Sequence, residues 1–148
     1  MTDTPQQDGR KLRVARQFIS ALPHAKALGM EILDIRDGEA DVRMPYDERL
    51  IGDPKTGVIH GGSVSTLMDS CCGAAVVSHP ENAADTATID LRIDYMRAAK
   101  PGDALTAVAT CYHVTRTAAF VRAVALDSDK DNPVATATGA FTFKKVAS

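Results

Sequence analysis

The sequence predicts an α+β domain in which one long apolar helix packs against a largely antiparallel sheet. The chain has 148 residues, the size of a single domain with one core. Residues 56–80 contain one charged side chain, that of Asp69, and their apolar residues recur at helical spacing. Residues 88–144 are rich in Val, Thr, Ala and Phe and are broken by short turns, which is typical of consecutive antiparallel strands.

Composition places the chain among ordinary globular proteins. It is 45% hydrophobic and 24% charged with a net charge of -2, which excludes a disordered chain and a nucleic-acid binder that depends on bulk basicity. No run reaches the ~18 apolar residues of a membrane helix. Residues 1–9 are polar, so we expect them to be flexible and not to act as a signal peptide. The 3 cysteines form no disulfide framework, which favours a cytoplasmic location.

The N-terminal part predicts a helix followed by a hairpin. Apolar side chains form one stripe along residues 10–22, and Pro23 ends this helix. Strands are expected at residues 30–36 and 39–46, on either side of an Asp-Gly pair that is typical of a tight turn. We expect residues 47–59 to form a loop, and a single domain to span residues 10–146.

The central helix is expected to begin near His60 and to end before Pro80, buried under the sheet because it is apolar on most sides. Residues 88–95 alternate strictly, which predicts a strand with Leu91 on the apolar face and Thr88 on the polar face. The same alternation puts Ile89, Ile93 and Tyr95 with Leu91, and Asp90, Arg92 and Asp94 with Thr88. Three more strands are expected at residues 104–114, 118–127 and 134–144.

Asp69 is the residue in this apolar helix that most needs an explanation. An ionised carboxylate in a buried helix costs several kcal/mol unless it is paired or hydrogen-bonded, on the order of 3–5 when a partner is missing. One interpretation is that Asp69 satisfies a neighbouring backbone group. The other is that it is held in a low-dielectric pocket as a base or nucleophile.

A second feature, His60-Gly61-Gly62, stands where the helix begins. Free N–H groups at a helix N-terminus can bind an oxyanion, and two glycines let a ligand approach the backbone. A glycine turn before a helix would look the same. His60 is either a catalytic imidazole or, as we favour, a side chain that fixes the loop.

The spacing of these features predicts a site shared between two chains. Gly61 and Asp69 are eight residues apart, or about 12 Å along a helix axis. An Asp side chain cannot span that distance, and a reacting carbonyl must lie ~3 Å from both the N–H donor and the attacking group. If both act on one carbonyl, they come from different subunits related by a two-fold axis.

The segment Gly57-Val-Ile-His60-Gly61-Gly62-Ser-Val-Ser-Thr-Leu-Met-Asp69 resembles the signature of the hotdog-fold acyl-CoA thioesterases. The resemblance is strongest to the subfamily typified by the phenylacetate-pathway thioesterase. Three later segments support it, in the right order over residues 25–145: Thr88-Ile-Asp-Leu-Arg-Ile-Asp-Tyr-Met96, Pro101-Gly102-Asp103 and Ala135-Thr-Ala-Thr-Gly-Ala-Phe-Thr142. It implies a long helix wrapped by a six-stranded antiparallel sheet, with an extra N-terminal helix in this chain, in homodimers that often pair as tetramers.

The resemblance also implies residue roles. It makes Gly61 the oxyanion donor beside Gly62, and Asp69 of the partner chain the base or nucleophile, assisted by Thr88. The substrate is acyl-CoA, and no separate cofactor is implied. Relatives carry an Asn in the loop before the two glycines; here Asp53 is the candidate for that role. Arg116 and Thr117, at a predicted hairpin turn, are candidates for contacts with CoA.

Two other functions fit the same residues. A hotdog dehydratase or hydratase would use His60 with an acidic residue to move a proton and water across a double bond. A non-catalytic acyl-CoA-binding module would keep the fold without hydrolysis, although such a module has little use for a costly carboxylate at position 69. The adjacent Cys71 and Cys72 are expected to fill core space, and the scattered histidines predict no metal site.

Overall fold

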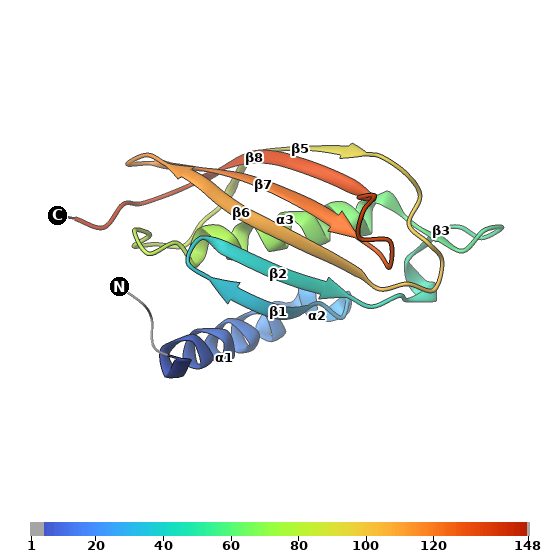
Figure 1. The fold of residues 1–148 in the computed structure, drawn as a ribbon, viewed down its shortest axis with the longest axis horizontal. Coiled ribbons are helices and arrows are strands. Elements are labelled where there is room, and N and C mark those ends of the chain that lie inside the picture. The colour runs from blue at the N-terminus through green and yellow to red at the C-terminus, as the bar shows by residue number, and fades with distance from the viewer. Residues whose placement is uncertain (1–4, 148) are drawn as a thin grey trace.

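The computed structural model describes residues 5–147 (Figure 1). Its helices are α1 (Pro5–Ala21), α2 (Pro23–Ala27) and α3 (Gly61–Val77), with a short 3-10 helix, η1 (Glu48–Leu50). Its strands are β1 (Glu31–Arg36), β2 (Glu39–Met44), β3 (Ile51–Asp53), β4 (Val58–Ile59), β5 (Thr88–Tyr95), β6 (Leu105–Val114), β7 (Ala118–Leu126) and β8 (Ala135–Thr142).

The predicted fold class is confirmed. A 6-stranded sheet has the order β1-β2-β6-β7-β8-β5, with every neighbouring pair antiparallel, and it curves over α3 (Figure 1). α1 lies beside β1, where the side-chain Nε of Arg16 donates to the carbonyl oxygen of Ile32 at 3.0 Å. One sheet edge is therefore covered by a helix, and β5 forms the other edge.

α3 buries one face against the sheet. The buried residues follow the three- and four-residue spacing of a helix: Val64, Leu67, Met68, Cys71, Cys72, Ala75 and Val76. The opposite face is less apolar than expected and stays partly open, with Asp69 half-buried and Val77 45% exposed. No helix within residues 5–147 is long and apolar enough to cross a membrane.

The N-terminal part differs from the prediction at its ends. α1 begins at Pro5 rather than near residue 10, so residues 5–9 are helical where a flexible segment was expected. Residues 1–4 of that segment lie outside the described part. Pro23 ends α1 as predicted but also begins α2, because proline fits the first turn of a helix, where its missing N–H costs nothing.

The segment expected as a loop, residues 47–59, instead contains η1 and the antiparallel pair β3–β4. This small hairpin folds back on the start of α3. A Cβ added to Gly52 would lie 2.7 Å from the Cα of His60, so only glycine allows the two backbones to approach this closely. The hairpin fixes the position of His60, the residue that precedes α3.

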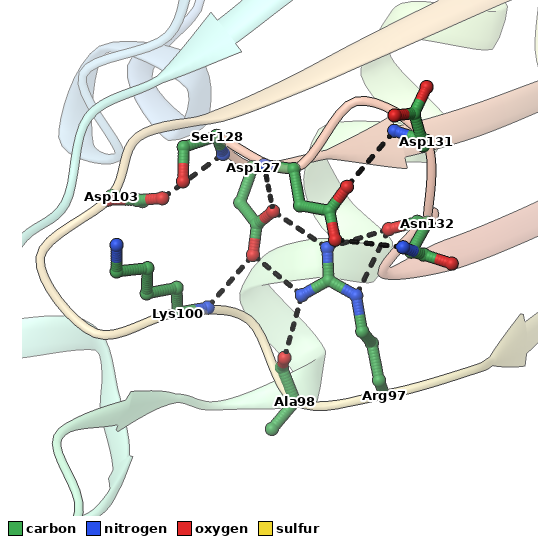
Figure 2. A network of polar contacts seen from close by, with 9 residues as sticks. Arg97, Ala98, Lys100, Asp103, Asp127, Ser128, Asp131 and Asn132 are labelled. Carbon is green, nitrogen blue, oxygen red and sulfur yellow. Dashed lines mark hydrogen bonds and ion pairs between the residues drawn. The ribbon is translucent and has the colours of Figure 1, made fainter.

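A buried ion pair joins the connections that follow β5 and β7 (Figure 2). Both carboxylate oxygens of Asp127, which is 1% exposed, accept from the guanidinium of Arg97 at 2.7 Å. Asp127 also accepts from the backbone N–H groups of Lys100 and Asp129, each at 3.0 Å. These contacts, with the Arg97 guanidinium first among them, hold the pKa of the Asp127 carboxyl far below its usual range.

Candidate functional site

Asp69 and Thr88 meet on the open face of α3. The hydroxyl of Thr88 donates to Oδ1 of Asp69 at 2.7 Å, a short bond of the kind made to an ionised acceptor. Asp69 is half-buried rather than enclosed, and its second oxygen has no hydrogen-bond partner among the described residues. The carboxylate is therefore oriented by one donor and keeps one oxygen available to a reactant.

The face of Thr88 was predicted wrongly, and the cause is a β-bulge. The pairing of β5 with β8 shifts register between Thr88 and Asp90, so Thr88 lies opposite Phe141, which is buried under the sheet. Side chains of directly paired residues lie on the same face. The extra residue, Ile89, thus reverses the alternation and turns Thr88 toward α3, as bulges beside functional sites often do.

Asp69 and Thr88 lie at the wall of a groove of about 1020 Å³. The groove runs between α1 and α3 and is closed by residues 85–88. Most of its wall is apolar, with contributions from Val14, Phe18, Ile19, Leu22, Ala74 and Val77. A carboxylate in these surroundings is less well hydrated than one at an open surface, which strengthens its electrostatic effect on a bound ligand.

The start of α3 presents one free backbone donor. His60 is the N-cap, and its ring nitrogen Nδ1 accepts from the N–H of Gly62 at 2.9 Å. Neither backbone nor side chain within residues 5–147 offers an acceptor to the N–H of Gly61. Gly61 therefore has the geometry expected of an oxyanion donor, whereas the Gly62 N–H and His60 Nδ1 satisfy each other. This bond supports a structural role for His60 over a catalytic imidazole.

Tyr95 holds the first turn of α3 from the end of β5. Its hydroxyl donates to the carbonyl oxygen of Gly61 at 3.0 Å and lies 2.7 Å from the hydroxyl of Ser65, which also bonds that carbonyl. A Cβ on Gly61 would lie 3.4 Å from the Tyr95 ring. The orientation of the Gly61 peptide is thus fixed from two sides.

A single chain does not bring Gly61 and Asp69 together. Gly61 opens onto a separate cavity of about 290 Å³ that is also lined by Tyr95 and Arg97. Asp69 lies two turns along the same helix and faces the larger groove. The structure of one chain thus contains both halves of the predicted site at two different places.

The remaining candidates line neither of these two cavities. Asp53 closes the β3–β4 turn, where its two carboxylate oxygens accept from the N–H of Lys55 at 3.0 Å and the hydroxyl of Thr56 at 2.9 Å. Arg116 and Thr117 are exposed in the turn between β6 and β7, and their carbonyl oxygens bond the segment after β8. In this chain, the side chain of Asp53 stabilises a turn, and the backbones of Arg116 and Thr117 hold another turn against the segment after β8.

The paired cysteines belong to the core. Cys71 and Cys72 are fully buried, and burial raises the pKa of the Cys72 thiol to about 12, with a further contribution from the negative charge of Asp69. A thiol with such a pKa stays protonated at neutral pH and is a poor nucleophile.

Two features of the site were missed. The contact of Tyr95 with Gly61 joins residues 34 positions apart, and no pattern in the sequence indicates it. The groove wall formed by α1 is the second missed feature. In the sequence, the apolar stripe along residues 10–22 indicated only a helix.

Comparison with known proteins places the chain in a family. Residues 56–134 match the family model of the thioesterase superfamily. The medium/long-chain acyl-CoA thioesterase YigI of Escherichia coli is 26% identical over 141 residues, which cover 86% of this chain and 90% of that protein. A protein of Halobacterium salinarum is 43% identical over 76 residues, 49% of this chain and 50% of that protein, so the chain matches half the length of this relative.

A solved structure shows the same architecture. The phenylacetic acid degradation protein PaaI from Thermus thermophilus superposes with a TM-score of 0.72 at 26% identity, over 82% of this chain and 99% of that one. The similarity confirms both the fold and the relationship that the sequence motifs indicated.

Proposed function

Because the chain belongs to the thioesterase superfamily and is thus a thioester hydrolase, we propose that it hydrolyses acyl-CoA thioesters to a free acid and CoA. The observation that supports this most is the Asp69 carboxylate, hydrogen-bonded by Thr88 and facing a largely apolar groove. The relative YigI, which is named as a medium/long-chain acyl-CoA thioesterase, aligns along 90% of its length and supports the same substrate class.

The reaction needs two groups at one carbonyl. The Asp69 carboxylate either takes a proton from the attacking water or attacks the carbonyl carbon itself. Negative charge then develops on the carbonyl oxygen, and the N–H of Gly61 stabilises it by a hydrogen bond. Collapse of the tetrahedral intermediate breaks the carbon–sulfur bond and releases CoA as the thiolate. If water is the nucleophile, the other product is the free acid; if Asp69 attacks, it is a mixed anhydride with Asp69, which water then hydrolyses to the free acid and the restored carboxylate.

The two groups meet in a dimer. Within one helix they are about 12 Å apart, too far to act on the same carbonyl. β5 is an uncovered sheet edge, and three large apolar side chains near it are exposed: Ile89 at 60%, Tyr95 at 52% and Met96 at 61%. An open apolar edge of this kind favours pairing with a second copy. A two-fold axis at this edge would place Asp69 of one chain beside Gly61 of the other, twice per dimer.

An assay with a panel of acyl-CoA thioesters tests the function. We expect thiol release by the wild-type protein and a loss of at least ~10²-fold in kcat for Asp69→Asn, which keeps the size of the side chain and removes its charge. Circular dichroism and size-exclusion chromatography check that the variant folds and assembles.

Each competing function predicts a different result in the same assay. A dehydratase would change the acyl double bond without releasing thiol. A binding module would bind acyl-CoA and release no thiol. A fully active Asp69→Asn variant would assign a structural role to the carboxylate.

A further inference from the structure

We propose that the groove between α1 and α3 holds the acyl chain of the substrate, and that α1 sets the length of chain that the enzyme accepts. This inference rests on the proposed function, because the thioester must lie at Asp69 for its acyl chain to enter the groove.

The groove wall has the chemistry of an acyl-chain site. Val14 is 56% exposed, Phe18 55% and Val77 45%, although all three are large apolar side chains that line the same groove. Exposed apolar side chains gathered in one concave surface mark a place where an apolar ligand is bound. The volume of about 1020 Å³ is ample for such a ligand.

The groove also has the length of a medium or long acyl chain. From Arg10 to Ile19, the first and last residues of α1 that line the groove, the helix runs about 14 Å, and Leu22 continues the wall beyond the end of the helix. α1 and α3 run in opposite directions, so the N-terminal half of α1 lies toward the C-terminal end of α3, which carries Val77 (Figure 1). That end is about 12 Å beyond Asp69, eight residues along α3. An acyl chain whose thioester lies at Asp69 would thus extend along the groove toward Val77, past the side chains that α1 contributes to the wall.

The other arm of the substrate fits this groove poorly. The pantetheine arm of CoA carries two amides, which lose hydrogen bonds to water when they enter an apolar wall. The phosphates of CoA are negatively charged, and two carboxylates, Asp69 and Asp85, line the groove. Three cations also line it: Lys11 is paired with Asp37 at 2.9 Å, Arg36 is paired with Glu39 at 2.8 Å, and Arg10 is exposed. The acyl chain is therefore the part of the substrate that the groove favours.

α1 is held firmly enough to act as a fixed wall. Ile19 is 4% exposed, and Arg16 bonds the backbone of β1. Because the helix is fixed on the side that faces β1, the side chains on its groove face determine how much room remains in the groove for the acyl chain.

Val14→Trp tests this by filling part of the groove from its α1 wall. We measure kcat/KM for hexadecanoyl-CoA and butanoyl-CoA and take their ratio. The tryptophan should lower the ratio at least about tenfold, since a pocket that is too short rejects the longer chain. Gln17→Trp is the matched control, because Gln17 lies on the same helix, is exposed and does not line the groove. It should leave the ratio unchanged.

Other results would overturn the inference. An unchanged ratio in a folded, active Val14→Trp enzyme would mean that the acyl chain binds elsewhere, while thiol release would still support the proposed function. A change in oligomeric state with equal loss on both substrates would mean that a second copy covers the groove. If Val14→Trp does not fold, Phe18→Ala takes its place, and it should lower the same ratio by removing contacts to the longer chain. Absence of thiol release from every acyl-CoA in the wild type would reject the proposed function itself.

Discussion

At the scale of single residues, the proposed contribution of the Thr88 hydroxyl to catalysis can be tested by substitution. Thr88→Val keeps the shape of the side chain and removes the 2.7 Å bond to Asp69. A hydrogen bond to a charged group contributes about 1.5–3 kcal/mol, so we expect kcat for acyl-CoA hydrolysis to fall by roughly tenfold or more. Thr88→Ser keeps the hydroxyl and should retain most of the activity. Equal kcat values for the Val and Ser variants would contradict the role of this bond.

Residue types and spacing single out Asp69 and Gly61 as candidates, and the structure shows a half-buried carboxylate and a helix start at these two positions. A lone carboxylate in an apolar helix and a glycine pair at its start are local patterns that keep their meaning in the fold. The orientation of Thr88 is not local. It depends on a register shift between β5 and β8, strands with 39 residues between them, and strict alternation within residues 88–95 pointed to the wrong face.

At the scale of elements, Gly139 lets β8 approach β5 beside this bulge. A Cβ at Gly139 would lie 2.3 Å from the carbonyl oxygen of Asp90, which no real Cβ tolerates. We expect Gly139→Ala to lower the free energy of unfolding by about 1–3 kcal/mol, because the strands must move apart. Urea denaturation followed by circular dichroism measures the change.

Gly73→Ala is the matched control for that experiment. A Cβ at Gly73 meets nothing closer than Phe141 Cε1 at 3.8 Å, an ordinary contact. Alanine is favoured over glycine inside a helix by about 0.5–1 kcal/mol, so this variant should be as stable as the wild type or more so. If the Gly139→Ala protein is no less stable than the Gly73→Ala protein, the close approach of β5 and β8 is disproved.

The long helices and strands were largely predictable, but their ends and the short strands between them were not. The apolar stripe of α1 and the alternation of the long strands are strong periodic signals. β3 and β4, with 3 and 2 residues, are too short to show a period, and they exist because the hairpin packs on His60. The groove depends on how far α1 stands from α3, which is a property of tertiary packing.

At the scale of the whole molecule, the Asp127–Arg97 pair links stability to pH. The pKa of Asp127 is lowered in the folded chain, chiefly by Arg97, so the unfolded chain binds this proton more readily. Its stabilisation is complete above the usual aspartate pKa of about 4 and is lost as the pH falls toward the folded value. We expect Asp127→Asn to cost about 2–3 kcal/mol at pH 7.

The gap between wild type and Asp127→Asn should then narrow by about 1 kcal/mol at pH 3, where the unfolded wild type is largely protonated at this position. Chemical denaturation of both proteins at the two pH values gives this difference directly. A gap that is the same at pH 3 as at pH 7 would show that the ion pair does not couple folding to this proton.

The proposed sharing of the active site between two chains also belongs to the scale of the whole molecule, and subunit mixing tests it most directly. Asp69→Asn lacks the carboxylate, and Gly61→Val crowds the oxyanion donor against Tyr95, whose ring lies 3.4 Å from the position of the first added carbon. Either variant alone should be nearly inactive. In a mixed dimer, both changes fall in one site and leave the other intact. Equal amounts of the two, exchanged at random, should therefore recover about a quarter of wild-type thioesterase activity. Differently tagged subunits, purified in tandem, verify the exchange, and verified mixed dimers that hydrolyse no acyl-CoA would contradict a site built from two chains.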